Sequence, residues 1–147
     1  MSAFSLEDYG PLLVGSFLRT HTHDEFEEGY LGQMARIYDS GRRFSLVLDA
    51  TKMPALTRPQ TKRQALWMRE RATQIHTQCL GLAFVFSSPV SRFVLTSLFL
   101  FQRLPCPYAV TGTRAAALDW CAGRLRAAGM DPLDAVMRAK AGAVRAT

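Results

Sequence analysis

The sequence is poor in cysteine and has no long apolar run. Its three cysteines, Cys79, Cys106 and Cys121, lie far apart in the chain. Cysteine ligands of a metal usually come in close pairs, so we expect no metal site and no disulfide framework, and instead buried, reduced thiols. The apolar stretch over 93–101 is about half of the ~20 residues that cross a membrane. The N-terminal residues lack the pattern of a signal peptide, and we therefore expect a cytoplasmic protein.

Signatures of catalysis and of nucleotide binding are also missing. The sequence contains no Gly-x-x-x-x-Gly-Lys segment, no Gly-x-Gly-x-x-Gly segment after a strand and no Gly-x-Ser-x-Gly elbow. Paired carboxylates for acid–base catalysis are scarce, and helix capping explains the four acidic residues that follow Thr22. We expect no enzymatic activity, no catalytic residue and no cofactor.

Basic residues outnumber acidic ones, and the formal net charge is +6 at pH 7. A positive charge suits nucleic acid as a partner. However, no helix-turn-helix, zinc-finger or RNA-binding signature accompanies it. We therefore interpret the excess as surface arginine, and we do not expect nucleic acid as the partner.

Strand and helix patterns alternate along the chain. Gly10-Pro11 marks a turn between two apolar segments, which predicts a β-hairpin. Thr22 and Glu25 have the spacing of a capping box, and the helix that follows should end at Gly41. Further strands are expected at 44–50, 82–86 and 108–111, and further helices at 58–79, 91–103 and 114–128. The order ββαβαβαβα predicts an α/β domain with a mixed, mostly parallel sheet on which the helices pack.

This element order resembles the STAS fold of anti-sigma-factor antagonists and of the cytoplasmic domains of sulfate transporters. The likeness is closer to small bacterial STAS-like proteins, grouped with the sporulation antagonist and the CRAL-TRIO lipid carriers. It covers roughly residues 4 to 128. Besides the element order, it depends on residues 44–49 with the basic helix segment at 63–67, and on 81–85, 91–95 and 117–120. The resemblance implies a STAS-like domain over 1–130, followed by a basic, partly helical tail over 131–147.

In phosphorylated antagonists of this family, a serine follows the central strand. Here that strand ends in Asp49-Ala50-Thr51, which does not match the phosphorylated segment. The resemblance implies regulation or scaffolding through contact with another protein. Because this segment departs from the family's motif, the sequence does not predict phosphorylation at this place.

Two surfaces are candidates for binding. On the helix at 58–79, the stripe Ala65, Met68, Ala72, Ile75 and Cys79 predicts the core face, and Trp67 is then expected to point away from it, between Arg63 and Arg71. An aromatic residue framed by two arginines is a typical binding hot spot. The alternative is that the arginine stems or the C-terminal tail shield Trp67.

The helix at 91–103 is apolar nearly all round, which is more than one sheet face needs. It could form a homodimer seam, line an apolar cavity or be covered by the C-terminal helix. The residues concerned are Phe93, Leu98, Phe99 and Phe101. Two functions follow: a regulatory or scaffolding module that binds protein as a homodimer, or a carrier or sensor of an apolar small molecule or lipid.

Overall fold

The computed structural model describes residues 2–52, 56–89 and 103–146, with the backbone alone at 143–146. The described residues contain a five-stranded sheet in the order β1-β2-β3-β4-β5. The strands are β1 (Phe4–Asp8), β2 (Leu12–Phe17), β3 (Phe44–Asp49), β4 (Cys79–Val85) and β5 (Tyr108–Thr111). β1 pairs with β2 antiparallel, and all the other pairs are parallel. The predicted hairpin and the mostly parallel sheet are confirmed.

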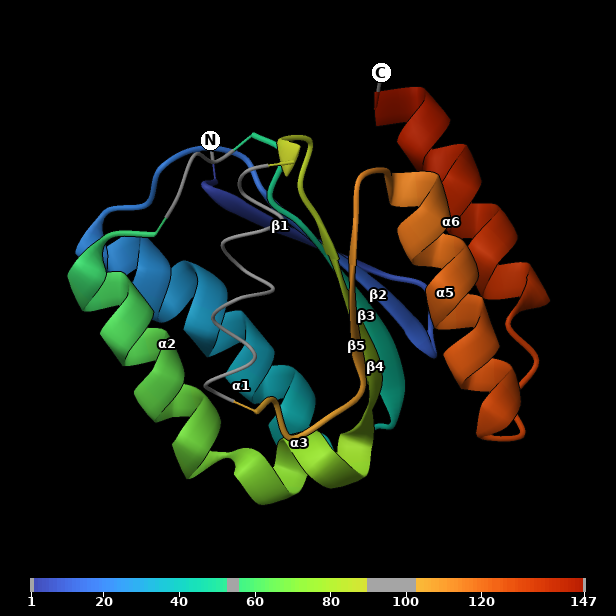
Figure 1. Ribbon diagram of the computed structural model, residues 1–147, viewed down its shortest axis with the longest axis horizontal. Coiled ribbons are helices and arrows are strands. Elements are labelled where there is room, and N and C mark those ends of the chain that lie inside the picture. The colour runs from blue at the N-terminus through green and yellow to red at the C-terminus, as the bar shows by residue number, and fades with distance from the viewer. Residues whose placement is uncertain (1, 53–55, 90–102, 147) are drawn as a thin grey trace.

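Helices cover both faces of the sheet and give an α/β/α layering (Figure 1). One face carries η1 (Glu25–Leu31), α1 (Gly32–Asp39), α2 (Arg58–Glu70) and α3 (Ala72–Gln78), and the other carries α5 (Arg114–Ala127) and α6 (Leu133–Ala146). The helix predicted from residue 91, with its four candidate residues Phe93, Leu98, Phe99 and Phe101, lies outside the described residues. Among the helices that are described, none has the length and apolar character to cross a membrane.

Thr22 and Glu25 form the predicted capping box. The Thr22 N–H donates to Glu25 Oε1 over 2.9 Å, and the Glu25 N–H donates to Thr22 Oγ1 over 3.2 Å. The chain then forms the π-helical segment η1 before it continues as α1, and it turns at Gly41 with a positive φ of 76°. Apolar spacing does not distinguish a π-helical turn from an α-helical one, so the sequence did not predict η1.

The prediction of a single helix over 58–79 is wrong, because the helical conformation is interrupted at Arg71, between α2 and α3. Arg71 has φ −108° and ψ 17°, outside the helical region. α2 buries Trp67 and α3 buries Ile75. In a straight helix these two residues would differ by about 80° in direction, and the break lets both of them face the core.

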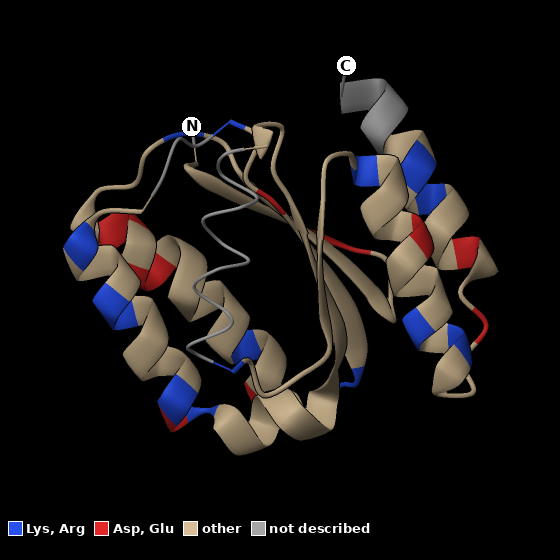
Figure 2. Cartoon of the chain, in the orientation of Figure 1, with Lys and Arg blue, Asp and Glu red and all other residues tan. Residues whose placement is uncertain are grey.

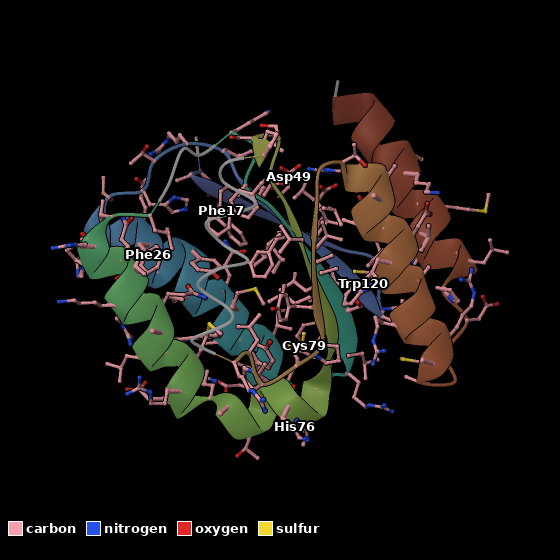
Figure 3. All side chains as sticks on the ribbon, in the orientation of Figure 1. Phe17, Phe26, Asp49, His76, Cys79 and Trp120 are labelled. Carbon is pink, nitrogen blue, oxygen red and sulfur yellow. The ribbon has the colours of Figure 1, made fainter. Side chains whose placement is uncertain are left out.

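The core consists of two clusters, one on each face of the sheet. The cluster under η1, α1, α2 and α3 is rich in aromatic residues, among them Phe4, Phe17, Phe26, Tyr30, Tyr38 and Phe44. The cluster under α5 and α6 consists of aliphatic and small residues, among them Val14, Val47, Ala83, Ala117 and Cys121. Figure 3 shows Phe17 and Phe26 on the first side and Trp120 on the other. The three cysteines are buried, as predicted, and each is a free thiol in this structure.

Candidate interaction surface

Trp67, the centre of the predicted hot spot, lies in the core. Its side chain is 7% exposed and packs against Tyr38, with ring centroids 5.9 Å apart. The prediction that Trp67 points outward is therefore wrong. α2 lies beside α1, so the face that carries Trp67 has a neighbour that periodicity alone does not reveal.

Arg63 and Arg71 frame Trp67 as expected, but both form ion pairs within the chain. Arg63 Nε donates to Glu27 Oε1 over 2.7 Å, and Arg71 Nη1 donates to Asp39 Oδ1 over 2.9 Å. The Arg71 guanidinium also lies over the Trp67 ring, 5.4 Å from its centroid. Its hydrogen bond lowers the pKa of the Asp39 carboxyl. The two arginines thus connect α2 to the neighbouring helical segment η1–α1, and Arg71 covers the Trp67 ring.

The opposite side of α2 faces solvent, and we call it the α2 outer face: Arg58, Lys62, Leu66 and Arg69. All four are exposed, and Leu66 is 47% exposed. They recur at intervals of four, four and three, so they share one side of the helix. Within the described parts of the chain, none of the three basic residues forms an ion pair. Figure 2 shows the basic residues along α2.

The start of α2 is fixed to the loop before η1. The Gln60 N–H donates to Thr57 Oγ1 over 3.3 Å, and the Thr57 N–H donates to Gln60 Oε1 over 3.0 Å. Gln60 Nε2 also donates to the carbonyl of His21 over 3.0 Å. His21 is itself buried beside Phe17, and this burial lowers its pKa. The α2 outer face therefore sits on a helix that is held at its end and on its inner side.

A second polar cluster lies at the carboxyl ends of the parallel strands, the edge where many α/β proteins bind ligands. Asp49, labelled in Figure 3, ends β3 and accepts hydrogen bonds from Arg114 Nη2 over 2.9 Å and from the Thr51 hydroxyl over 2.7 Å. Arg114 Nη2 also donates to Ser16 Oγ over 2.9 Å. Burial raises the pKa of Asp49, but the hydrogen bonds from Thr51 and Arg114 outweigh it and leave that pKa below its usual value. Arg114 Nη1 also lies 3.7 Å from Glu7 Oε1, so its guanidinium stands between two carboxylates and connects α5 to the sheet.

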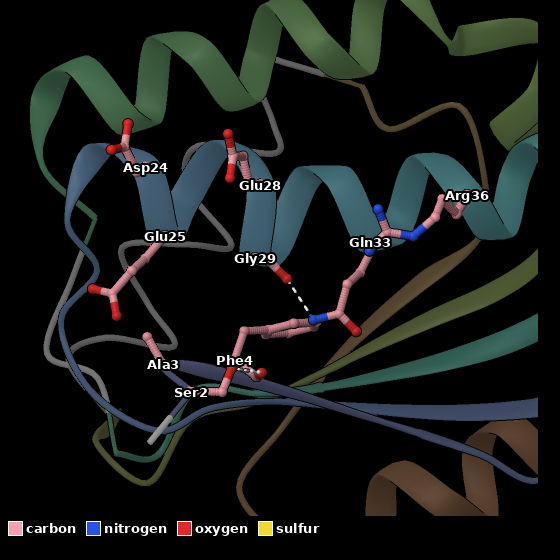
Figure 4. Close-up of a pocket in the computed structure, with 9 residues that line it drawn as sticks. All are labelled: Ser2, Ala3, Phe4, Asp24, Glu25, Glu28, Gly29, Gln33 and Arg36. Carbon is pink, nitrogen blue, oxygen red and sulfur yellow. Dashed lines mark hydrogen bonds between the residues drawn. The ribbon is translucent and has the colours of Figure 1, made fainter.

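A hollow of about 430 Å³ lies between the start of β1 and the η1–α1 segment (Figure 4). Its lining includes the charged residues Asp24, Glu25, Glu28 and Arg36 and the amide of Gln33, which donates to the Gly29 carbonyl over 2.6 Å. Charged walls favour water over an apolar ligand. With four charged residues among the nine that line it, the hollow does not favour a lipid or another apolar small molecule.

Comparison of the sequence with protein-family models finds no match, and comparison with curated proteins finds none either. Comparison with solved structures finds a match to an uncharacterised protein of the DUF3478 family from Shewanella loihica PV-4, which has a SpoIIAA-like fold. The two chains are 14% identical, the match covers 81% of this chain and 92% of the other, and the TM-score is 0.58. At this identity the likeness concerns the fold. The chain has the SpoIIAA-like fold, which is the STAS fold that its element order predicts.

Proposed function

We propose that this protein is a non-catalytic regulatory or scaffolding module that binds another protein through the α2 outer face. The observation that carries the proposal is the combination of an exposed Leu66 with three basic side chains that have no ion-pair partner in the described parts of the chain. The STAS fold is compatible with such a role.

The chemistry of the α2 outer face defines the partner. Arg58 and Arg69 are eleven positions apart, which is about 16 Å along a helix. An apolar residue among cations suits a protein surface that has an apolar pocket with carboxylates around it. Nucleic acid would supply the negative charge but offers fewer apolar contacts for Leu66 than a protein pocket does. The net charge of +6 also favours encounter with an acidic partner.

The carrier hypothesis has less support. Its pocket was expected beside Phe93, Leu98 and Phe101, which lie outside the described residues. The hollow beside β1 has charged walls. No observation on the described residues therefore favours an apolar ligand over a protein.

Photo-crosslinking in cells tests the proposal. A photoreactive amino acid at position 66 should give a discrete adduct with one protein, because this position lies at the centre of the α2 outer face. Replacing Lys62 and Arg69 with glutamate in the same chain should abolish the adduct. Position 126, which is exposed on α5, is the matched control and should give none. Equal labelling at both positions, or no adduct at position 66, would contradict the proposal.

A further inference from the structure

α6 carries a second exposed apolar surface, on the other face of the sheet from α2. Leu133 is 60% exposed and Met137 is 62% exposed. They are four residues apart, and Ala141, also exposed, continues the row by one more turn. We call these three residues the α6 stripe. The inner side of α6 buries Ala135, Val136 and Ala139 in the core cluster that it shares with α5.

The charges beside the α6 stripe are balanced within the chain. Arg138 Nε donates to Asp134 Oδ2 over 2.9 Å, and Lys140 Nζ donates to Asp119 Oδ1 over 3.0 Å. The Arg138 guanidinium also lies over the Tyr9 ring and donates to the Tyr9 carbonyl. The α6 stripe is therefore an apolar surface in locally neutral surroundings.

This balance distinguishes the α6 stripe from the α2 outer face. In a symmetric dimer the same patch occurs on both sides of the interface. The α2 outer face, paired with itself, would set three unmatched cations against three more, which is unfavourable. The α6 stripe, paired with itself, brings together apolar groups and charges that already have partners. The α2 outer face thus fits a foreign acidic protein, and the α6 stripe fits its own copy.

We propose that a second copy of this chain docks on the α6 stripe, with the two α6 helices antiparallel about a two-fold axis beside Met137. Leu133 lies one turn before Met137, and Ala141 lies one turn after it. In an antiparallel pair, Leu133 of each copy therefore lies opposite Ala141 of the second copy. Asp134 and Arg138 lie on the same side of the stripe. Antiparallel pairing therefore places Asp134 of each copy near Arg138 of the second copy and extends the existing ion pair into a network.

The dimer is expected to be weak. Two large apolar side chains from each copy make a contact below the size of a standard stable interface. It should appear as a reversible, concentration-dependent equilibrium. Because its contacts are mainly apolar, it should persist at high salt, whereas an association that depends on the α2 outer face should weaken.

Sedimentation equilibrium of the full chain, from about 1 μM to about 1 mM, tests this proposal. The wild type should show a monomer–dimer equilibrium, and Met137→Glu should weaken it by at least about tenfold. Leu66→Glu is the matched control and should leave it unchanged, which separates this proposal from the one on the α2 outer face. A wild type that stays monomeric throughout, or a dimer that Leu66→Glu disrupts and Met137→Glu does not, would overturn it.

Disulfide trapping gives a second measurement that does not depend on the folding of a charged variant. The native cysteines are buried, so a new surface thiol reports on its own surroundings. Met137→Cys, treated with a mild oxidant, should form a covalent dimer because residue 137 of each copy lies at the two-fold axis. Arg126→Cys on α5 should not. Equal dimer formation by the two variants would refute the α6 interface.

Discussion

Leu66 and Trp67 are adjacent in α2, yet the first is 47% exposed and the second 7%. Trp67→Ala removes a buried indole that packs against Tyr38 and lies under the Arg71 guanidinium. Truncating a buried tryptophan to alanine costs about 3–5 kcal/mol in the free energy of unfolding. For a chain of this size, each kcal/mol lowers the melting temperature by about 2–4 °C, so the expected loss is about 6–20 °C.

Leu66→Ala is the matched control. About half of this side chain is already in water, and alanine is at least as good a helix former, so the expected loss of stability is below about 1 kcal/mol. Urea unfolding of both variants, followed by far-UV circular dichroism, measures the difference without relying on tryptophan fluorescence. If Trp67→Ala unfolds within about 1 kcal/mol of the wild type, Trp67 is not a core residue and the assignment of the outer face to Leu66 fails.

Three further substitutions test the packing and the ionisable groups. Gly15→Ala would place a methyl group 2.6 Å from Phe4 Cζ and should lower the free energy of unfolding by about 1–3 kcal/mol. Gly123→Ala, in open space within α5, should raise the free energy of unfolding by about 0.5–1 kcal/mol. Thermal unfolding measures both changes. Burial lowers the pKa of His21, so below about pH 6.5 the unfolded state binds more protons and stability falls as the pH drops. His21→Phe should remove that slope from urea midpoints at different pH values. The pKa of Asp49 is also lowered, so its stabilisation is present above the unfolded pKa and lost as the pH falls through the folded pKa. Asp49→Asn should flatten this acid limb, and an unchanged limb would argue against the role of its ion pair.

Local chemistry made much of the fold predictable. Gly10-Pro11 marks the hairpin turn, and Thr22 with Glu25 sets the start of the first helix, because these signals act over a few residues. The short apolar run at 44–49 likewise identifies β3 without reference to the rest of the chain.

The candidate surface was less predictable because it depends on contacts between distant segments. Helical periodicity places Trp67 and Leu66 relative to each other, but it does not say that α1 covers one side of α2. The break at Arg71 coincides with an ion pair to Asp39, 32 residues away in the sequence. The pair of Asp49 with Arg114 spans 65 residues. A parallel sheet does bring the end of β3 and the start of α5 to one edge, and this was the available signal for the second pair.

The strand order has a consequence for synthesis, because each strand pairs with its nearest strand in the sequence. The parallel pairs join residues far apart in the chain, such as Leu12 with Ser45 and Leu82 with Tyr108, and the loops that must close make such pairing slow. The sheet can still extend strand by strand while the ribosome is translating, at about 5–20 residues per second. The helix α5, however, is synthesised only after β1 to β5. Until residues 114–127 emerge, the apolar sheet face of Leu12, Val14 and Val47 has no cover. During this interval the nascent chain exposes an apolar sheet face, and such transient exposure favours aggregation unless a chaperone covers it.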